Sequence, residues 1–136
     1  DTHKKHSESL KKLLMPRMDQ CFTALLEDLE QRGLLDETLV VWLSEFGHTP
    51  RINANAGRDH WGHVYSLALA GGGIRGGTVH GASDAHAAYP VDGMVRPRDL
   101  IVTVFHCLGY PPDAEVRDPL GRPLAISRGR VIDEIL

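Results

Sequence analysis

The chain has 136 residues, of which 42% are hydrophobic and 24% charged, and its formal net charge is −3. This length suits one compact domain with a modest core, and the composition is ordinary for an α/β protein. The slightly acidic balance argues against a nucleic-acid partner, which would need a clustered excess of basic residues. No stretch approaches the ~20 apolar residues of a membrane helix, so we expect no membrane span.

The first predicted element is a long helix over residues 6–32. Apolar side chains recur there at steps of three and four residues and form one stripe along the helix. Pro16 should kink this helix or divide it into two, because proline has no backbone N–H to donate. Gly33 is typical of a C-terminal stop.

The next element is a short apolar run from Thr38 to Leu43 that is rich in β-branched residues. Because it follows a helix directly, it predicts a strand buried on both faces of a parallel sheet. Glu45 comes just after this strand, and open α/β sheets place their chemistry at the carboxyl ends of strands. Residues 46–63 form a long polar loop, and such loops are often functional.

The second half of the chain predicts shorter elements. A run from Val64 to Ala70 predicts another strand, which a glycine turn at residues 71–73 should end. A helix is predicted over residues 96–108, with Pro97 in its first turn. The remaining segments are punctuated by proline and glycine and predict loops with short strands.

Potential metal ligands gather at three places in the chain. Asp1 and His3 stand at its start, Glu45 follows the first predicted strand, and Asp59 and His60 lie in the loop. Carboxylate and imidazole together suit Zn²⁺ and similar ions, whereas carboxylates alone suit Ca²⁺ or Mg²⁺. In ester hydrolysis a metal ion would neutralise charge on a phosphate or sulfate group and activate a nucleophile. The sequence therefore predicts a divalent metal ion, Zn or Ca, as the cofactor.

Each group of ligands also has a purely structural interpretation. The residues at the start could be a solvated terminus, Glu45 could pair with Arg51, and Asp59–His60 could be a hydrogen-bonded pair within a loop. Arg51 or Arg58 could hold an oxyanion, because the guanidinium group has forked donors. The spacing alone leaves these alternatives open.

The order of the segments is more specific than any single one. Residues 38–47 resemble the strand of sulfatases and alkaline phosphatases that ends in Ser-Asp-His-Gly. Residues 70–77 look like the strand and turn that follow the last metal-ligand histidine of that superfamily, and residues 95–109 are similar to its late helix. The motifs Glu-Phe-Gly-x-Thr-Pro (45–50) and Gly-Arg-Asp-His-Trp (57–61) resemble those of a sulfatase-like family of uncharacterised function within the alkaline phosphatase superfamily.

This resemblance implies the fold class. The expected architecture is α/β: a partial three-layer α/β/α sandwich of the alkaline phosphatase and sulfatase type, with a mostly parallel sheet. Residues 1–136 would be the C-terminal portion of one such domain, with its N-terminal half and the nucleophile outside this chain. Proteins of this family often look exported or periplasmic.

The resemblance also implies roles for the ligands. Asp1, His3 and His60 would match the ligands of one metal site, and Glu45 would stand where a second site has an aspartate. Phe46 departs from the pattern, because it occupies the position of a ligand histidine and cannot coordinate a metal. A single metal site is therefore favoured over a pair.

Two functions remain in view. The first is a metal-dependent hydrolase for sulfate or phosphate esters, of a small molecule or a saccharide, in which Arg58 contacts the anion and Asp59 orients His60. The second is a non-catalytic binding or structural module that kept the fold and lost the chemistry, which Phe46 favours. A sheet built from these strands alone would expose an edge through which copies of the chain could associate.

Overall fold

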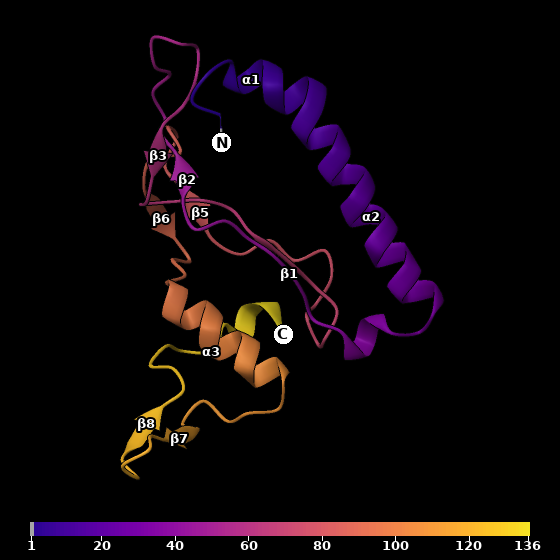
Figure 1. Ribbon diagram of the computed structural model, residues 1–136, viewed down its shortest axis with the longest axis vertical. Helices are drawn as coiled ribbons and strands as arrows, with labels where there is room; N and C mark the ends of the chain where they lie inside the picture. Colours follow the sequence, from indigo (N-terminus) through magenta and orange to yellow (C-terminus); the bar gives the residue numbers. More distant parts are fainter. Residues whose placement is uncertain (1) are drawn as a thin grey trace.

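The structure is a computed structural model that describes residues 2–136. Figure 1 shows a long helix along one side of the molecule and a second, shorter helix near the other end, with narrow strand pairs between and beyond them. None of the helices in residues 2–136 is both long and apolar enough to cross a membrane, as the composition predicts.

The N-terminal helical run is continuous but has an irregular turn. It consists of α1 (His6–Ser9), a π-helical turn (Leu10–Leu14) and α2 (Met15–Gln31). Pro16 lies in the first turn of α2, where a missing N–H is tolerated, and the wider π-helical turn just before it divides the run. Gly33 has φ of +67°, a conformation that glycine adopts without strain, and the helix ends before it. The predicted helix and its stop are confirmed.

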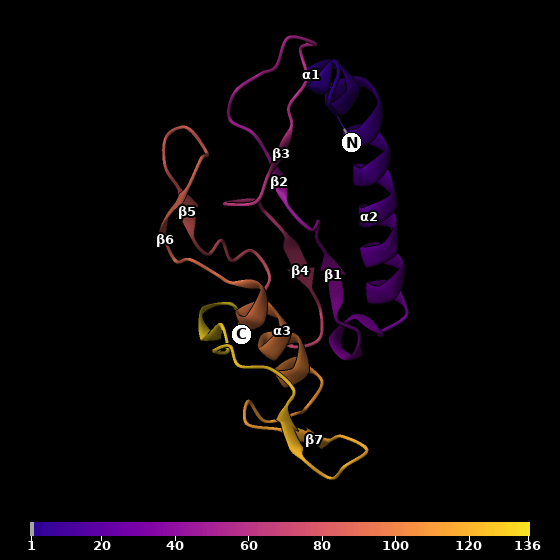
Figure 2. The same ribbon diagram turned by 60° about the vertical axis from the view of Figure 1, so that its left-hand side comes forward.

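All strands of the described residues form two-stranded antiparallel sheets. Figure 2 shows β1 and β4 side by side, with α2 running along them. The pairs are β1 (Val40–Trp42) with β4 (Ala68–Ala70), β2 (Gly47–His48) with β3 (His60–Trp61), β5 (Ala82–Ser83) with β6 (Pro90–Asp92), and β7 (Glu115–Arg117) with β8 (Pro123–Ala125).

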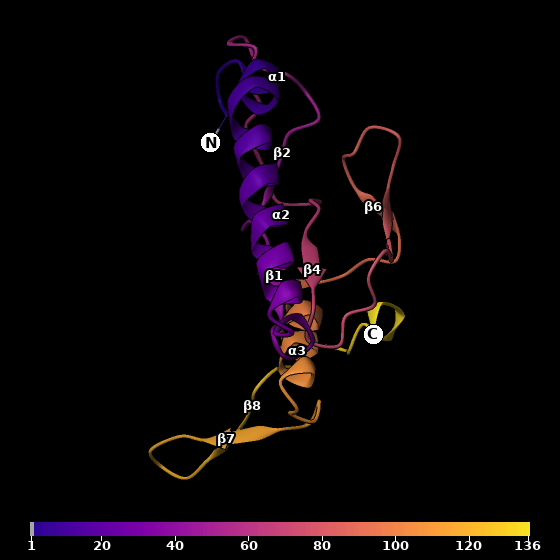
Figure 3. The same cartoon turned by 90° about the vertical axis from the view of Figure 1, so that its right-hand side faces the viewer.

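The predicted α/β/α sandwich with a mostly parallel sheet is therefore wrong. A continuous apolar run indicates a parallel strand because parallel sheets are usually covered on both faces. Here β1 keeps such a run in an open two-stranded ribbon, and Trp42 and Leu43 remain 41% and 50% exposed. Figure 3 shows the β5–β6 ribbon standing away from α2 rather than joining a common sheet with β1 and β4.

The core of the described residues lies at α3 (Pro97–Cys107). The buried hydrophobic side chains are Leu100, Val102 and Ile132, so the C-terminal segment packs against this helix just before the short 3₁₀ turn η3 (Asp133–Ile135). The backbone N–H of Ile132 donates to Thr103 Oγ1 at 3.0 Å, which fixes that packing. The predicted helix over residues 96–108 is confirmed; Ile101 on α3 and Leu108 just after it remain 46% and 61% exposed.

Asp99 connects the start of α3 to the C-terminal segment. Its carboxylate accepts the backbone N–H of Arg96 at 2.9 Å and that of Arg130 at 3.0 Å. Burial alone would raise the Asp99 pKa, but these two hydrogen bonds together with the nearby arginine charges hold it below its ordinary value.

We predict that Asp99→Asn lowers the free energy of unfolding at pH 7 by about 1–3 kcal/mol, because a helix cap and a buried acceptor are lost together. A carboxyl whose folded pKa is lowered stabilises the fold above about pH 4 and loses that effect as pH falls through the folded pKa. Urea unfolding at pH 7 and pH 3 measures both effects. Asp113→Asn, on an exposed turn, is the matched control, and equal losses in the two variants would contradict the assignment.

Candidate functional site

The segment at residues 2–6 docks against the loop between β2 and β3. The backbone N–H of Arg58 donates to the Thr2 carbonyl at 3.1 Å, and that of His6 donates to the Ala56 carbonyl at 2.9 Å. Gly57 lies between these contacts, where an added Cβ would meet the His3 carbonyl oxygen at 1.8 Å. Only glycine fits this close approach, which brings distant parts of the chain together.

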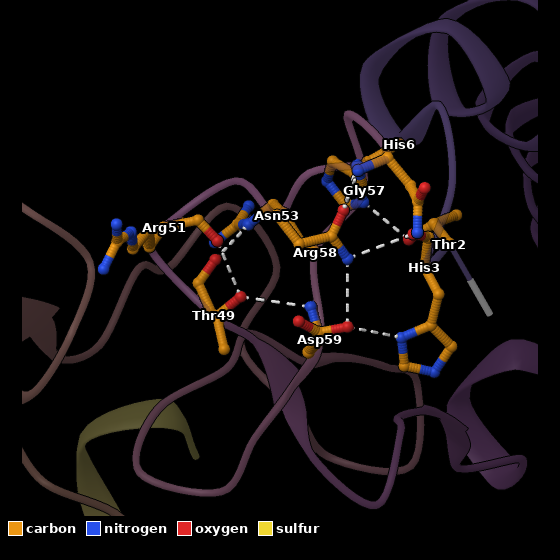
Figure 4. A network of polar contacts seen from close by, with 10 residues as sticks. Thr2, His3, His6, Thr49, Arg51, Asn53, Gly57, Arg58 and Asp59 are labelled. Atoms are coloured by element: carbon orange, nitrogen blue, oxygen red, sulfur yellow. Dashed lines mark hydrogen bonds and ion pairs between the residues drawn. The ribbon is translucent and has the colours of Figure 1, made fainter.

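Asp59 is the centre of the resulting polar network (Figure 4). His3 Nδ1 donates to Asp59 Oδ1 at 2.9 Å, and Asn53 Nδ2 donates to the same oxygen at 3.0 Å. The hydrogen bond from His3, followed by that from Asn53, lowers the pKa of Asp59 below its ordinary value. Asn53 Nδ2 also donates to the His3 carbonyl at 3.1 Å, so one amide side chain orients both members of the pair.

His60 lies beside this pair. The ring centroids of His3 and His60 are 4.8 Å apart, and that of Phe46 is 4.2 Å from His60 on another side. The sequence predicted that Asp59 would orient His60, whereas in the structure it bonds to His3. The imidazoles of His3 and His60 therefore lie next to each other. The Asp59 carboxylate bonds to His3, and the Phe46 ring packs on His60.

Two further ligands were predicted from the sequence. Glu45 is exposed, and its carboxylate accepts the Ser44 hydroxyl at 3.4 Å. Asp1 lies outside the described residues. Within residues 2–136, no three side chains of His, Cys, Asp or Glu are grouped closely enough to hold a metal ion. The structure brings His3, Asp59 and His60 together.

Arg58 stabilises the β2–β3 loop through hydrogen bonds to backbone carbonyls. Its Nη2 donates to the His48 carbonyl at 2.9 Å, and its Nε donates to the Thr49 carbonyl. The predicted anion contact of Arg58 therefore competes with two bonds to backbone oxygens. Arg51 instead lines a shallow groove of about 370 Å³ that also borders Asp59 and Thr49.

A second histidine pair escaped the sequence reasoning. The rings of His6 and His48 are 5.3 Å apart, and Thr2 Oγ1 lies 2.5 Å from His6 Nδ1 in a buried hydrogen bond. Burial, and after it the Arg58 guanidinium, lowers the pKa of both imidazoles. No local pattern marks this pair, because His6 and His48 come from distant segments of the chain.

The chain also matches a family model with the description "Protein of unknown function (DUF1501)", over residues 1–136. No curated protein and no solved structure matches it. The match corrects the resemblance drawn from the motifs, because it points to a family of unknown function and nothing found points to sulfatases or alkaline phosphatases.

We predict that Gly57→Ala detaches residues 2–6 from the loop, because the new methyl group would overlap the His3 carbonyl. The free energy of unfolding should fall by about 1–3 kcal/mol, and the pKa of Asp59 should rise toward that of a free aspartate as its bond to His3 is lost. Carboxyl NMR titration follows Asp59 directly. Gly62→Ala is the control, because a Cβ at Gly62 meets nothing within 4 Å. An unchanged Asp59 titration in Gly57→Ala would contradict the docking.

Proposed function

The chain belongs to the DUF1501 family of unknown function. We propose that it is a metal-dependent hydrolase domain that acts on sulfate or phosphate esters. The observation that supports this most is the His3–Asp59 pair at 2.9 Å beside the His60 ring at 4.8 Å. A carboxylate that fixes one imidazole while a second imidazole lies alongside is the arrangement found around protein metal ions.

The donor types fit a divalent transition metal. His3 and His60 would hold the ion, and Asp59 would fix the ring orientation of His3 through Nδ1. Asp1, predicted as a ligand from the sequence, would add a carboxylate, and further ligands or water would complete the usual four positions. When bound, the ion would neutralise charge on the ester oxygens and lower the pKa of a coordinated water.

The chain's own residues would position the ester. Asn53 holds the Asp59 carboxylate and the His3 backbone in one geometry. Arg51, on the groove that reaches Asp59, offers a forked cation for a sulfate or phosphate group. Arg58 keeps the β2–β3 loop in shape by binding its carbonyls. The substrate would be a small-molecule or saccharide ester whose anionic end enters from the Arg51 side.

A second candidate function has its own support. Phe46 packs on His60 with ring centroids 4.2 Å apart, and it fills space that a further ligand would need. This contact favours a module that binds a metal or an anion without turning over an ester.

We predict that the 136-residue chain binds Zn²⁺ by isothermal titration calorimetry. His3→Ala and His60→Ala should each weaken binding at least about 100-fold, because a ligand is removed. Asp59→Asn should weaken it about 10–100-fold, because the ligand imidazole loses its orienting carboxylate. His106→Ala, at an exposed position of α3, is the matched control.

Turnover separates the two candidate functions. The zinc-loaded chain is assayed with 4-nitrophenyl sulfate and 4-nitrophenyl phosphate, and hydrolysis lost in His3→Ala supports the hydrolase. Zinc binding without hydrolysis of either ester supports the non-catalytic module. A wild-type chain that binds no Zn²⁺, or binds it equally well without His3 and His60, rules out both forms of the metal proposal.

A further inference from the structure

The chain exposes more surface than a self-contained protein of its mass. Its accessible surface is 9736 Å², whereas a folded monomer of 15.0 kDa exposes roughly 7,000 Å². The surplus of roughly 2,700 Å² is more than three times the ~800 Å² that each partner gives to a standard interface. A surplus of this size leaves ample surface for contact with further polypeptide.

Part of this surplus is an apolar stripe that runs from the π-helical turn into α2. Leu14, Met18, Cys21 and Leu25 follow one another at steps of four, three and four residues, which are the core positions of a heptad pattern. Leu14 and Leu25 are 39% and 46% exposed, Cys21 is exposed as well, and Met18 is half-buried. Figure 1 shows α2 along the outer edge of the molecule, where a second helix could lie against it.

The same helical run has a charge pattern that complements itself. Its first half carries Lys11, Lys12 and Arg17 against Glu8 and Asp19, and its second half carries Glu27, Asp28 and Glu30 against Arg32. Within one copy, Lys12 already pairs with Glu8 at 3.0 Å and Asp28 with Arg32 at 2.8 Å, and the halves keep opposite net charges. Two parallel copies would place like charges together. Two antiparallel copies would place the basic half of each beside the acidic half of the other.

One axis satisfies both patterns. If the twofold axis passes between Asp19 and Gln20, Leu14 lies opposite Leu25 of the second copy, and Met18 lies opposite its Cys21. The same axis places Lys11 opposite Asp28 of the second copy and Lys12 opposite its Glu27. Apolar side chains therefore meet at the centre and opposite charges meet at both ends. Leu14, Lys11 and Lys12 lie in the π-helical turn (Leu10–Leu14), where the wider turn shifts their positions relative to α2.

We propose that two copies of this chain associate through α2 in an antiparallel, isologous pair about this axis. The interface is separate from the His3–Asp59–His60 cluster, so the proposal does not depend on metal binding. It also differs from association through a sheet edge, because the contacting surface is a helix face.

Sedimentation equilibrium of the chain over 1–100 µM tests the proposal. Wild-type protein should sediment at twice the 15.0 kDa chain mass. Leu25→Glu should weaken dimerisation at least about 100-fold, because the symmetric interface buries the new charge twice. Leu120→Glu, at a position that is 78% exposed on the β7–β8 hairpin, is the matched control and should remain dimeric. Circular dichroism checks that both variants keep their helices.

Charge reversal tests the antiparallel orientation. A variant with Lys11→Glu and Lys12→Glu should be monomeric, and so should a variant with Glu27→Lys and Asp28→Lys, because each places like charges at both ends of the pair. An equimolar mixture of the two should form a mixed dimer. A monomeric wild-type chain at 100 µM, a dimer unaffected by Leu25→Glu, or single-reversal variants that dimerise as well as wild type would each overturn the proposal.

Discussion

The close approach of the His3 carbonyl to Gly57 is the contact on which the candidate site depends. It lets residues 2–6 lie along the β2–β3 loop, with the Thr2 and Ala56 carbonyls accepting backbone N–H groups across the junction. Without it, His3 would belong to a solvated terminus and Asp59 to an isolated loop. With it, a carboxylate and an imidazole that are 56 residues apart share a hydrogen bond, and His60 comes alongside. One glycine therefore converts separate local patterns into a cluster.

Local signals in the sequence were sufficient for the helices and insufficient for the sheets. Apolar periodicity, Pro16 and Gly33 predict the N-terminal helical run because each acts within a few residues. The direction and partner of a strand depend on distant segments, so the apolar run at β1 predicted a parallel sheet where the structure has an antiparallel ribbon with β4. The resemblance to sulfatases was inferred from the same segments, and the match to a family of unknown function corrects it.

Residue types drew attention to His3, Asp59 and His60, together with Asp1 and Glu45, because carboxylate and imidazole together suit metal ions. The pairing of these residues could not be predicted from the sequence. That Asp59 would bond to His3 depends on the loop path that Gly57 and Asn53 fix.

His3 and His60 are proposed to form one metal site that the docking of residues 2–6 holds in place. X-ray absorption spectroscopy at the zinc edge of the zinc-loaded chain tests this most directly, because imidazole ligands give a distinctive outer-shell scattering. Two imidazoles are expected in the wild-type chain and one in His60→Ala. A spectrum with oxygen ligands alone, or with the same imidazole count in both proteins, would contradict it.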